Sequence, residues 1–492
     1  MQDAQLLHAV LWVPLIGSLV IVAIGQGERA RWIALLASGV TALLATIMFV
    51  RFDLQTGGMQ FESTIPWIPQ IGSSLRIGVD GVSLPMVFLN AFLTFLAVVI
   101  SWKTEIRPQL YFALLLFLET AVTGVFTALD LFVFFLFWEL ELAPMYLLIG
   151  IWGGPRREYS AMKFIVYTIS GSAFMLVGIL GLFFLAAPGT GATFDFFAIA
   201  ERARALPVVI QTVLFFLLFI GFAVKVPIFP FHTWLPDAHT EAPTPVSVLL
   251  AGVLLKMGGY GLIRLCVTLL PEAARVAMPF LVALAVVNVL YGAALALAQI
   301  NSDLKKMIAC SSISHMGYVI LGLAALTPTG IEGAVMQMFT HGTVTALLFM
   351  MVGLVYDRTH TREIDQMTGL GARMPFIATG FVMAGLASLG LPGMNGFIGE
   401  FIVFIGAFPV WPIPTVLGAF AIVITAGYIT WMLLKVFFGP ITPNWRHLGD
   451  ADLRERGAVC LLLLVIIVVG VYPSSVVDMI AVGVGPIARL FA

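Results

Sequence analysis

Charged residues are scarce in this chain of 492 residues: Asp, Glu, Lys and Arg make up 10%, whereas 60% of the residues are hydrophobic. A soluble globular protein has roughly a quarter charged and about half apolar residues. This composition therefore excludes a water-soluble protein. Apolar stretches of about 20 residues recur along the whole chain, and each is long enough to cross a bilayer as a helix. We predict an all-α polytopic membrane protein.

Cysteine is also rare. Cys266, Cys310 and Cys460 lie far apart in apolar segments, so they cannot hold an iron–sulfur cluster, a tetrahedral zinc or a disulfide framework. No glycine-rich phosphate-binding motif lies between a soluble strand and a helix. The net charge is −1 without a basic run, which gives no sign of nucleic-acid binding. We therefore expect this chain to bind no cofactor, metal or nucleic acid.

The apolar stretches predict about 14 transmembrane helices in a single integral membrane domain, residues 1–492. Their centres are expected near residues 15, 41, 92, 120, 141, 173, 217, 256, 286, 314, 344, 385, 424 and 468. Segments 51–79, 188–206 and 357–373 are expected to be ordinary loops. We divide the chain into helices 1–3 (1–109), a first repeat (110–270), a second repeat (275–440) and helix 14 (441–492).

Proline interrupts two of the predicted helices. Pro227 and Pro230 lie within helix 7, and Pro392 lies within helix 12. Because proline removes a backbone hydrogen bond, both helices should break there, which a membrane protein tolerates only beside protein or a water-filled cavity. Breaks at corresponding positions are typical of inverted repeats that form an ion pathway. The spacing predicts two five-helix repeats, helices 4–8 and 9–13, in which Lys256 corresponds to Lys435.

Lys and Arg are more frequent on the side that the chain reaches after the first helix. The positive-inside rule predicts that this side is cytoplasmic. With an even number of helices, both termini then lie on the opposite side, which is periplasmic or equivalent.

Several ionisable residues lie inside the predicted spans, where a charge costs at least about 2.5–3.5 kcal/mol. They are Glu119, Glu139, Glu141, Lys225, Lys256, His315, His341 and Glu400, with Arg264 and Lys435 nearer the helix ends. A carboxylate that approaches or leaves a buried lysine changes whether the lysine keeps its proton, and histidine can relay protons near neutral pH. Such a set is typical of a proton relay.

Simpler interpretations remain open for some of these residues. Arg264 and Lys435 can reach the membrane interface with their side chains, and His341 can be an ordinary core histidine. Glu141 points to a different face from Glu139 and can make a structural hydrogen bond. The buried lysines and glutamates can form static ion pairs. His232 and His239 resemble a metal cluster, but Pro236 and the loop setting favour a capping network.

Five segments of the chain resemble the antiporter-like membrane subunits of proton-pumping NADH:quinone oxidoreductase (respiratory complex I), in particular the M branch, called subunit 4 in mitochondria. These segments are residues 137–146 (FWELELAPMY), 224–245, 255–261, 301–317 and 396–401. Glu400, where sister branches of the family have lysine, favours the M branch. The resemblance covers nearly the whole chain.

The resemblance implies the fold and the site. It implies fourteen helices with repeats 4–8 and 9–13, broken helices 7 and 12, and an ion pair between Glu139 and Lys225. The implied proton pathway consists of Glu139, Lys225, Lys256, His315 and Glu400, with Glu119, His341 and Lys435 as further candidates.

The resemblance also implies partners and location. FMN, iron–sulfur clusters and quinone are expected in partner subunits, beside other antiporter-like subunits of the membrane arm. A bacterial cytoplasmic membrane is expected, with the mitochondrial inner membrane as the alternative. The rival functions are a subunit of an Mrp-type cation/proton antiporter or membrane-bound hydrogenase, a stand-alone solute transporter and a structural scaffold.

Overall fold

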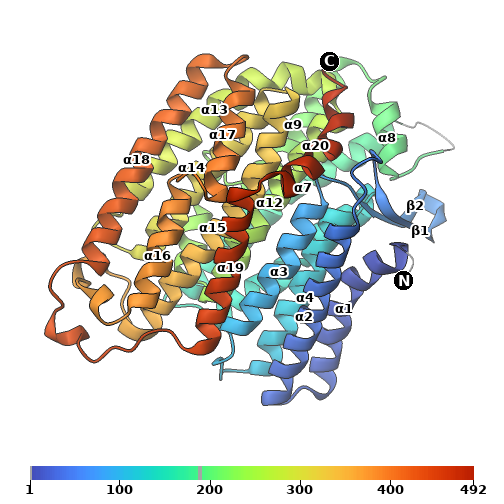
Figure 1. Cartoon of the computed structure of the whole chain (residues 1–492). Coiled ribbons are helices and arrows are strands. Elements are labelled where there is room, and N and C mark those ends of the chain that lie inside the picture. The colour runs from blue at the N-terminus through green and yellow to red at the C-terminus, as the bar shows by residue number, and fades with distance from the viewer. Residues whose placement is uncertain (1–2, 187–190) are drawn as a thin grey trace.

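Helices dominate the computed structural model, which describes residues 3–186 and 191–492 (Figure 1). The α-helices are α1 (Asp3–Ile24), α2 (Glu28–Arg51), α3 (Leu84–Ile100), α4 (Pro108–Thr127), α5 (Leu131–Leu140), α6 (Leu142–Trp152), α7 (Arg157–Ala186), α8 (Phe196–Ala203), α9 (Val208–Lys225), α10 (Trp234–Glu241), α11 (Thr244–Leu249), α12 (Leu255–Gly261), α13 (Pro271–Leu297), α14 (Leu304–Ala324), α15 (Pro328–Thr359), α16 (Pro375–Ser388), α17 (Asn395–Ala407), α18 (Pro412–Phe437), α19 (Leu453–Val471) and α20 (Ser474–Ala488). All of the predicted centres lie in these helices except residue 141, which lies at the α5–α6 junction.

Short 3₁₀ and π segments supplement these helices. The 3₁₀ segments are η1 (Pro69–Ile71), η4 (Ile364–Gln366), η5 (Leu370–Ala372) and η6 (Pro443–Trp445), and the π segments are η2 (Leu250–Leu254) and η3 (Leu262–Thr268).

A β-hairpin lies between α2 and α3, where the sequence predicted an ordinary loop. Strands β1 (Gln60–Ile68) and β2 (Ser73–Val79) pair antiparallel, and Arg76 on β2 forms an ion pair with Asp195, the N-cap of α8. The prediction of an ordinary loop at 51–79 is therefore wrong, because its two strands form backbone hydrogen bonds with each other. Segment 188–206 contains α8, and its residues 188–190 lie outside the described chain.

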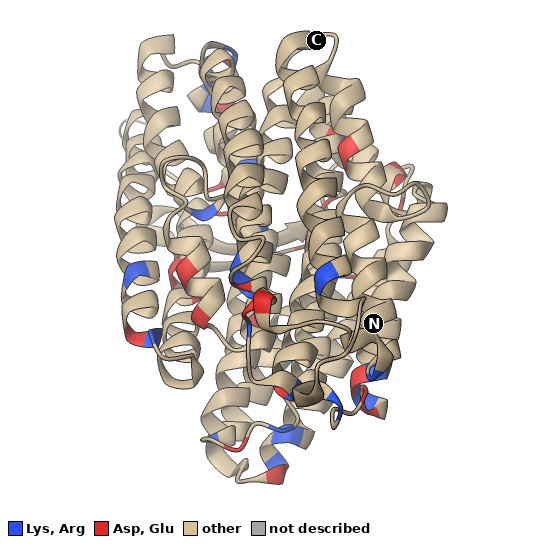
Figure 2. Ribbon diagram, turned by 90° about the vertical axis from the view of Figure 1, so that its left-hand side faces the viewer, with Lys and Arg blue, Asp and Glu red and all other residues tan. Residues whose placement is uncertain are grey.

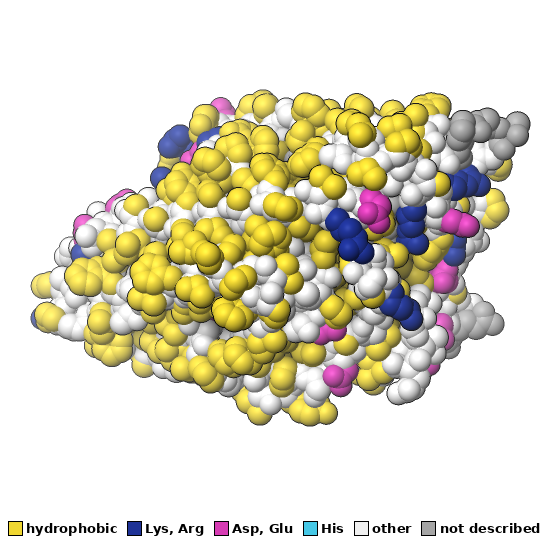
Figure 3. Space-filling view, turned by 90° about the horizontal axis from the view of Figure 1, so that it is seen from above, with side chains coloured by type: hydrophobic (Ala, Val, Ile, Leu, Met, Phe, Trp, Pro, Cys, Tyr) yellow, Lys and Arg dark blue, Asp and Glu magenta, His cyan; other side chains and the backbone are white. Residues whose placement is uncertain are grey.

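Eleven helices in the described chain are long and apolar enough to span a membrane, or up to twelve if α19 and α20, bent by 70°, form one span. Helices α3, α16 and α17 are apolar but shorter. The protein is thus a polytopic helical membrane protein. Figure 2 shows long stretches of helix without charged residues, and hydrophobic side chains cover much of the face seen in Figure 3.

Three spans form the centre of the bundle. Thr244–Thr268, Leu304–Ala324 and Pro328–Thr359 are each 100% buried over their most apolar window, whereas α1, α2, α7 and α18 are 33–39% buried. The outer helices carry large exposed hydrophobic residues such as Leu36 and Ile413, as expected for surfaces that face lipid or partner helices. The polar side chains of the central spans are therefore shielded from lipid.

The chain breaks inside both proline-containing spans. Residues 226–233 separate α9 from α10, and residues 389–394 separate α16 from α17. The second break contains Gly390 and Gly393 with φ of 77° and 93°, a conformation that only glycine adopts readily. Both predicted interruptions are confirmed, and the first one positions a buried lysine.

Candidate functional site

Lys225 is the last residue of α9, directly before the first break. Pro227 and Pro230 follow it and cannot donate backbone hydrogen bonds, which ends the helix. The Lys225 side chain is 1% exposed, and its Nζ donates a hydrogen bond to Oε1 of Glu141, which is fully buried. The two residues form a buried ion pair between α9 and the α5–α6 junction.

Two aromatic rings complete the surroundings of Lys225. The ring centres of Trp138 and Phe164 each lie 5.5 Å from Nζ, close enough for cation–π attraction. The second carboxylate oxygen of Glu141, Oε2, is buried and has no hydrogen-bond partner among the described residues. This oxygen is available to a proton or a water molecule.

The predicted pairing of Glu139 with Lys225 is wrong, because Glu141 takes that place. Residues two apart on a helix point to different faces, so only one of the two carboxylates can face Lys225. The helix is also interrupted at Glu141, three residues before Pro144, which lacks a backbone N–H. Glu139 is half-buried, and its Oε1 has no hydrogen-bond partner within the described chain. Its charge still acts on Glu141.

Lys256 lies on α12, between the two π segments η2 and η3. It is fully buried, and its Nζ donates to the carbonyl oxygen of Ala251, which belongs to η2. The same Nζ lies 2.7 Å from Nδ1 of His341 on α15. Since π segments are frequent at functional sites, this local geometry supports Lys256 as a site residue.

His315 and Glu400 extend the cluster across the second half of the chain. Nδ1 of His315 lies 3.2 Å from Oε1 of Glu400, and Oγ of Ser388 lies 3.4 Å from Nε2 of His315. The rings of His315 and His341 are 5.6 Å apart. Lys256, His341, His315 and Glu400 therefore form one row of buried titratable groups, which we call the central row.

A small cavity lies beside the central row. It is lined by His315, His341, Glu400 and neighbouring polar residues, including Gln337 and Thr340. Its volume of about 10 Å³ is near the space that one water molecule needs. Water at this position can bridge the two imidazole rings.

Two predicted site residues lie apart from these groups. Glu119 is fully buried on α4, and neither of its carboxylate oxygens has a hydrogen-bond partner in the described part of the protein. Lys435, near the end of α18, pairs with the half-exposed Asp365 and donates to Asn301. The structure brings neither of them to the central row.

Arg264, for which the sequence left open a side chain that reaches the membrane interface, forms a buried ion pair. It is 5% exposed and pairs with Asp80, in the turn before α3. Asp80 Oδ1 also accepts from the backbone N–H groups of Val82 and Ser83. A partner 184 residues away in the sequence was not visible in the local pattern.

His239 is a buried residue that sequence analysis interpreted as part of a capping network. Its ring is stacked on Phe349 at 4.5 Å, and both ring nitrogens lack hydrogen-bond partners among the residues described. It lies within electrostatic reach of both Lys256 and Lys305. The capping interpretation is therefore wrong. The spacing of His232 and His239 suggested a metal site, and nothing in the sequence indicated that the charges of Lys256 and Lys305 act on His239.

The described residues contain no group of three or more His, Cys, Asp or Glu that could hold a metal ion. His232 lies against aromatic rings instead, 5.2 Å from Tyr291 and 5.7 Å from Phe229 between ring centres. The arrangement of buried acids and bases suits proton transfer, since each group can hold one proton and pass it to the next.

Comparison with known proteins places these residues in a wider context. The family model described as "NADH:quinone oxidoreductase/Mrp antiporter, TM" matches residues 128–425, which include the buried ion pair and the central row. NAD(P)H-quinone oxidoreductase chain 4 from Synechococcus sp. is 44% identical over 482 residues, covering 95% of this chain and 89% of the relative.

Solved structures share the fold. A chain of respiratory complex I from Thermus thermophilus with bound NADH is 29% identical, with a TM-score of 0.90, 99% of this chain covered and 100% of the other. A chain of the Mrp complex from Dietzia sp. is 20% identical, with a TM-score of 0.87 and coverages of 100% and 98%. At 20% identity, the similarity to the Mrp chain concerns the fold alone.

Proposed function

Because this chain belongs to the NADH:quinone oxidoreductase/Mrp antiporter family of membrane subunits, we propose that it is a proton-translocating membrane-arm subunit of an NAD(P)H-quinone oxidoreductase. Relatives that are 43–44% identical over most of the chain are named as chain 4 of that enzyme. NAD(P)H oxidation and quinone reduction take place in other subunits, which carry the FMN and iron–sulfur clusters. The partners of this chain are these subunits and the neighbouring antiporter-like subunits.

The central row is the observation that carries this proposal. Lys256, His341, His315 and Glu400 are all buried, and adjacent members lie within hydrogen-bond or ring-contact distance. A buried charge costs several kcal/mol, so four titratable side chains in line need a functional reason. A proton that enters at Lys256 can leave at Glu400 without crossing lipid.

The ion pair of Lys225 with Glu141 acts as the switch in this proposal. When the carboxylate moves away from the ammonium, Lys225 holds its proton less firmly and passes it through water toward Lys256. Glu139 modulates the pair through its own charge and exchanges protons with Glu141. Moving one charge across 100 mV takes about 2.3 kcal/mol, which a change in proton affinity of about two pKa units supplies.

The membrane arrangement forms the second part of the proposal. We propose 14 crossings, with inverted repeats at 110–270 and 275–440, and breaks in helices 7 and 12. The breaks at 226–233 and 389–394 support it, although Lys435 has a different environment from Lys256. We also propose a bacterial cytoplasmic membrane with both termini on the periplasmic side, in keeping with the cyanobacterial relatives.

An Mrp-type antiporter subunit is the rival function. The Mrp chain of similar fold is 20% identical to this chain. The quinone oxidoreductase relatives match 92–95% of this chain at 43–44% identity. The comparison therefore favours the quinone oxidoreductase.

Removal of the ion pair tests the proposed function. We expect Lys225→Ala and Glu141→Gln to abolish proton pumping in the reconstituted complex, because the switch loses one of its two charges. The measurement is the pH gradient formed in liposomes per quinone reduced, together with subunit content as a check of assembly.

Two further variants complete this test. Glu139→Gln should reduce pumping less than Glu141→Gln, because Glu139 does not contact Lys225. Arg373→Gln, at an exposed position, is the control and should pump normally. Normal pumping by assembled Lys225→Ala and Glu141→Gln complexes would contradict the proposal.

A further inference from the structure

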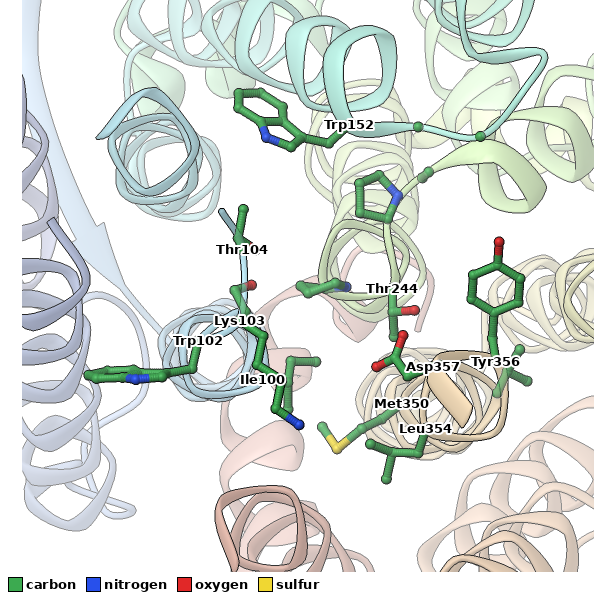
Figure 4. Close-up of a pocket in the computed structure, with 18 of the residues that line it drawn as sticks. Ile100, Trp102, Lys103, Thr104, Trp152, Thr244, Met350, Leu354, Tyr356 and Asp357 are labelled. Carbon is green, nitrogen blue, oxygen red and sulfur yellow. The ribbon is translucent and has the colours of Figure 1, made fainter. Parts of the chain in front are cut away.

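A cavity of about 450 Å³ opens on the face of the protein where most Lys and Arg residues gather. It lies between the loop after α3, the loop after α6, the segment before α11 and the last turns of α15 (Figure 4). Trp102, Lys103 and Thr104 line one side, and Tyr356 and Asp357 line the other. The cavity has room for several water molecules.

Lys305 lines the same cavity, in the first turn of α14. It is 5% exposed, and its Nζ donates to the carbonyl oxygen of Ala242. A buried ammonium held by a neutral carbonyl is costly without a carboxylate in contact. No salt bridge of Lys305 occurs in the described chain, whereas Lys103 at the rim contacts Asp452 at 3.0 Å.

The charged groups around Lys305 are engaged elsewhere. Asp303 caps α14 and pairs with Arg362 at 3.4 Å, and Oε2 of Glu241 accepts from the backbone N–H of Arg156 at 3.0 Å. Asp357 acts on Lys305 at longer range. The rim lysine behaves differently, because its hydrogen bond to Asp452 raises the pKa of Lys103 and keeps it charged.

Lys305 contacts the end of the helix that carries His239: its acceptor Ala242 is the C-cap of α10, three residues after His239. The imidazole of His239 is buried and has no hydrogen-bond partner among the described residues, and the charges of Lys305 and Lys256 both act on it. Lys305 therefore lies between the cavity and the end of the helix that carries His239.

We propose that this cavity is the proton entrance of the chain and that Lys305 is the first buried group to take the proton inward. The inference rests on the proposed function. In the step, the neutral amine of Lys305 takes a proton from a hydronium ion in the cavity, which leaves a water molecule. The ammonium then gives a proton to a ring nitrogen of His239, directly or through water, and returns to the amine.

Two substitutions at Lys305 separate transfer from structural support. Lys305→Met removes the titratable group, and Lys305→Arg keeps the charge and the donor to Ala242 but does not release its proton. We expect both to stop proton pumping by the assembled complex in liposomes. The half-buried neighbour Lys306 is the control, and Lys306→Met should pump normally. Full pumping by Lys305→Arg would assign Lys305 a structural role and overturn the proposal.

A chemical block tests the cavity without removing Lys305. Thr104→Cys places a thiol at the cavity wall, and its reaction with a bulky maleimide should stop pumping. Gly449→Cys lies in a loop outside the cavity lining, with open space where the new Cβ would lie, and the same reaction there should leave pumping intact. Unimpaired pumping by labelled Thr104→Cys would reject the entrance.

A further variant separates this inference from the proposed function. Lys256→Met removes a member of the central row. If Lys256→Met stops pumping while Lys305→Met pumps normally, the entrance is wrong and the proposed function stands. If neither variant affects pumping, both are wrong.

Discussion

At the scale of single residues, the exposure of each carboxylate separates the roles of the two neighbouring glutamates. Glu141 is fully buried and contacts Lys225, whereas Glu139 is half-buried and keeps a buried oxygen without a partner in the described chain. Two nearby carboxylates repel each other, so the charge of Glu139 acts on Glu141, while Glu141 makes the contact with Lys225. The pair is therefore best understood as one contact and one modulator.

The ion pair of Arg264 with Asp80 leads to a stability prediction. Removal of one partner from a buried ion pair leaves the other charge unpaired, which typically costs about 3–5 kcal/mol. We expect Arg264→Ala to lower the thermal unfolding midpoint of the purified complex or to impair its assembly. The double substitution Asp80→Ala/Arg264→Ala should cost less than the sum of the single ones.

The control for Arg264 is an arginine outside the buried region. Arg373→Ala, at an exposed position, should leave the midpoint nearly unchanged, because surface substitutions usually stay within about 0.5 kcal/mol. If Arg264→Ala were as stable as Arg373→Ala, the ion pair would have no structural importance.

At the scale of elements, the interruptions could be predicted wherever proline causes them. Pro227, Pro230 and Pro392 indicated both breaks in the correct places. The interruption at Glu141 was missed, although Pro144 follows it, and so were the π segments beside Lys256. No residue type is specific to π segments, and their formation depends on tertiary packing. The local sequence therefore gave no indication of them.

The same limit applies to the candidate site. Lys225, Lys256, His315, His341 and Glu400 could be selected because ionisable residues are conspicuous in apolar spans. The partner of Lys225 could not be predicted, since the choice between Glu139 and Glu141 depends on how the helix turns at the interruption. Lys305 lies at the start of a helix beside other charged residues, where burial is not apparent from sequence.

The second break supports a prediction about backbone conformation. Gly393 has φ of 93°, and no surrounding atom lies within 4 Å of the position that a Cβ would take, so Gly393→Ala introduces strain but no clash. Left-handed conformation costs a residue with a Cβ about 1–2 kcal/mol. We expect a lower thermal unfolding midpoint of the complex.

Gly427 provides the matched comparison for Gly393. It is exposed, lies inside α18 and also has open space around it. Alanine is favoured over glycine in a helix by about 1 kcal/mol, so Gly427→Ala should leave the midpoint unchanged or raise it. Equal effects of the two substitutions would contradict a conformational requirement at Gly393.

At the scale of the whole molecule, burial is graded from the centre outward. The spans that carry Lys256, His315 and His341 are fully buried, and the outer helices expose apolar side chains. This arrangement keeps the titratable groups out of lipid while the surface remains compatible with a bilayer. The sequence shows this gradation only in part: the three central spans are less apolar than α1, α2, α7 and α18, but all of them are apolar enough to cross a membrane.

The proposed orientation of the chain rests on the distribution of Lys and Arg and can be measured directly. Gly449 lies in the loop between α18 and α19, on the basic face, and Gly57 lies in the loop between α2 and β1, at the opposite ends of the spans. Both have open space for a new side chain. By the positive-inside rule, a membrane-impermeant maleimide should label Gly57→Cys in spheroplasts and Gly449→Cys in inside-out vesicles.

The native cysteines set the background of this measurement. Cys266 and Cys310 are buried and should stay unlabelled in the folded protein, whereas Cys460 is exposed and is replaced in a Cys460→Ser parent. Labelling after denaturation shows that each introduced thiol is present and reactive. The opposite pattern, with Gly449→Cys labelled in spheroplasts, would reverse the orientation and place the cavity with Lys305 on the periplasmic side. Lys305 would then lie where protons leave the chain.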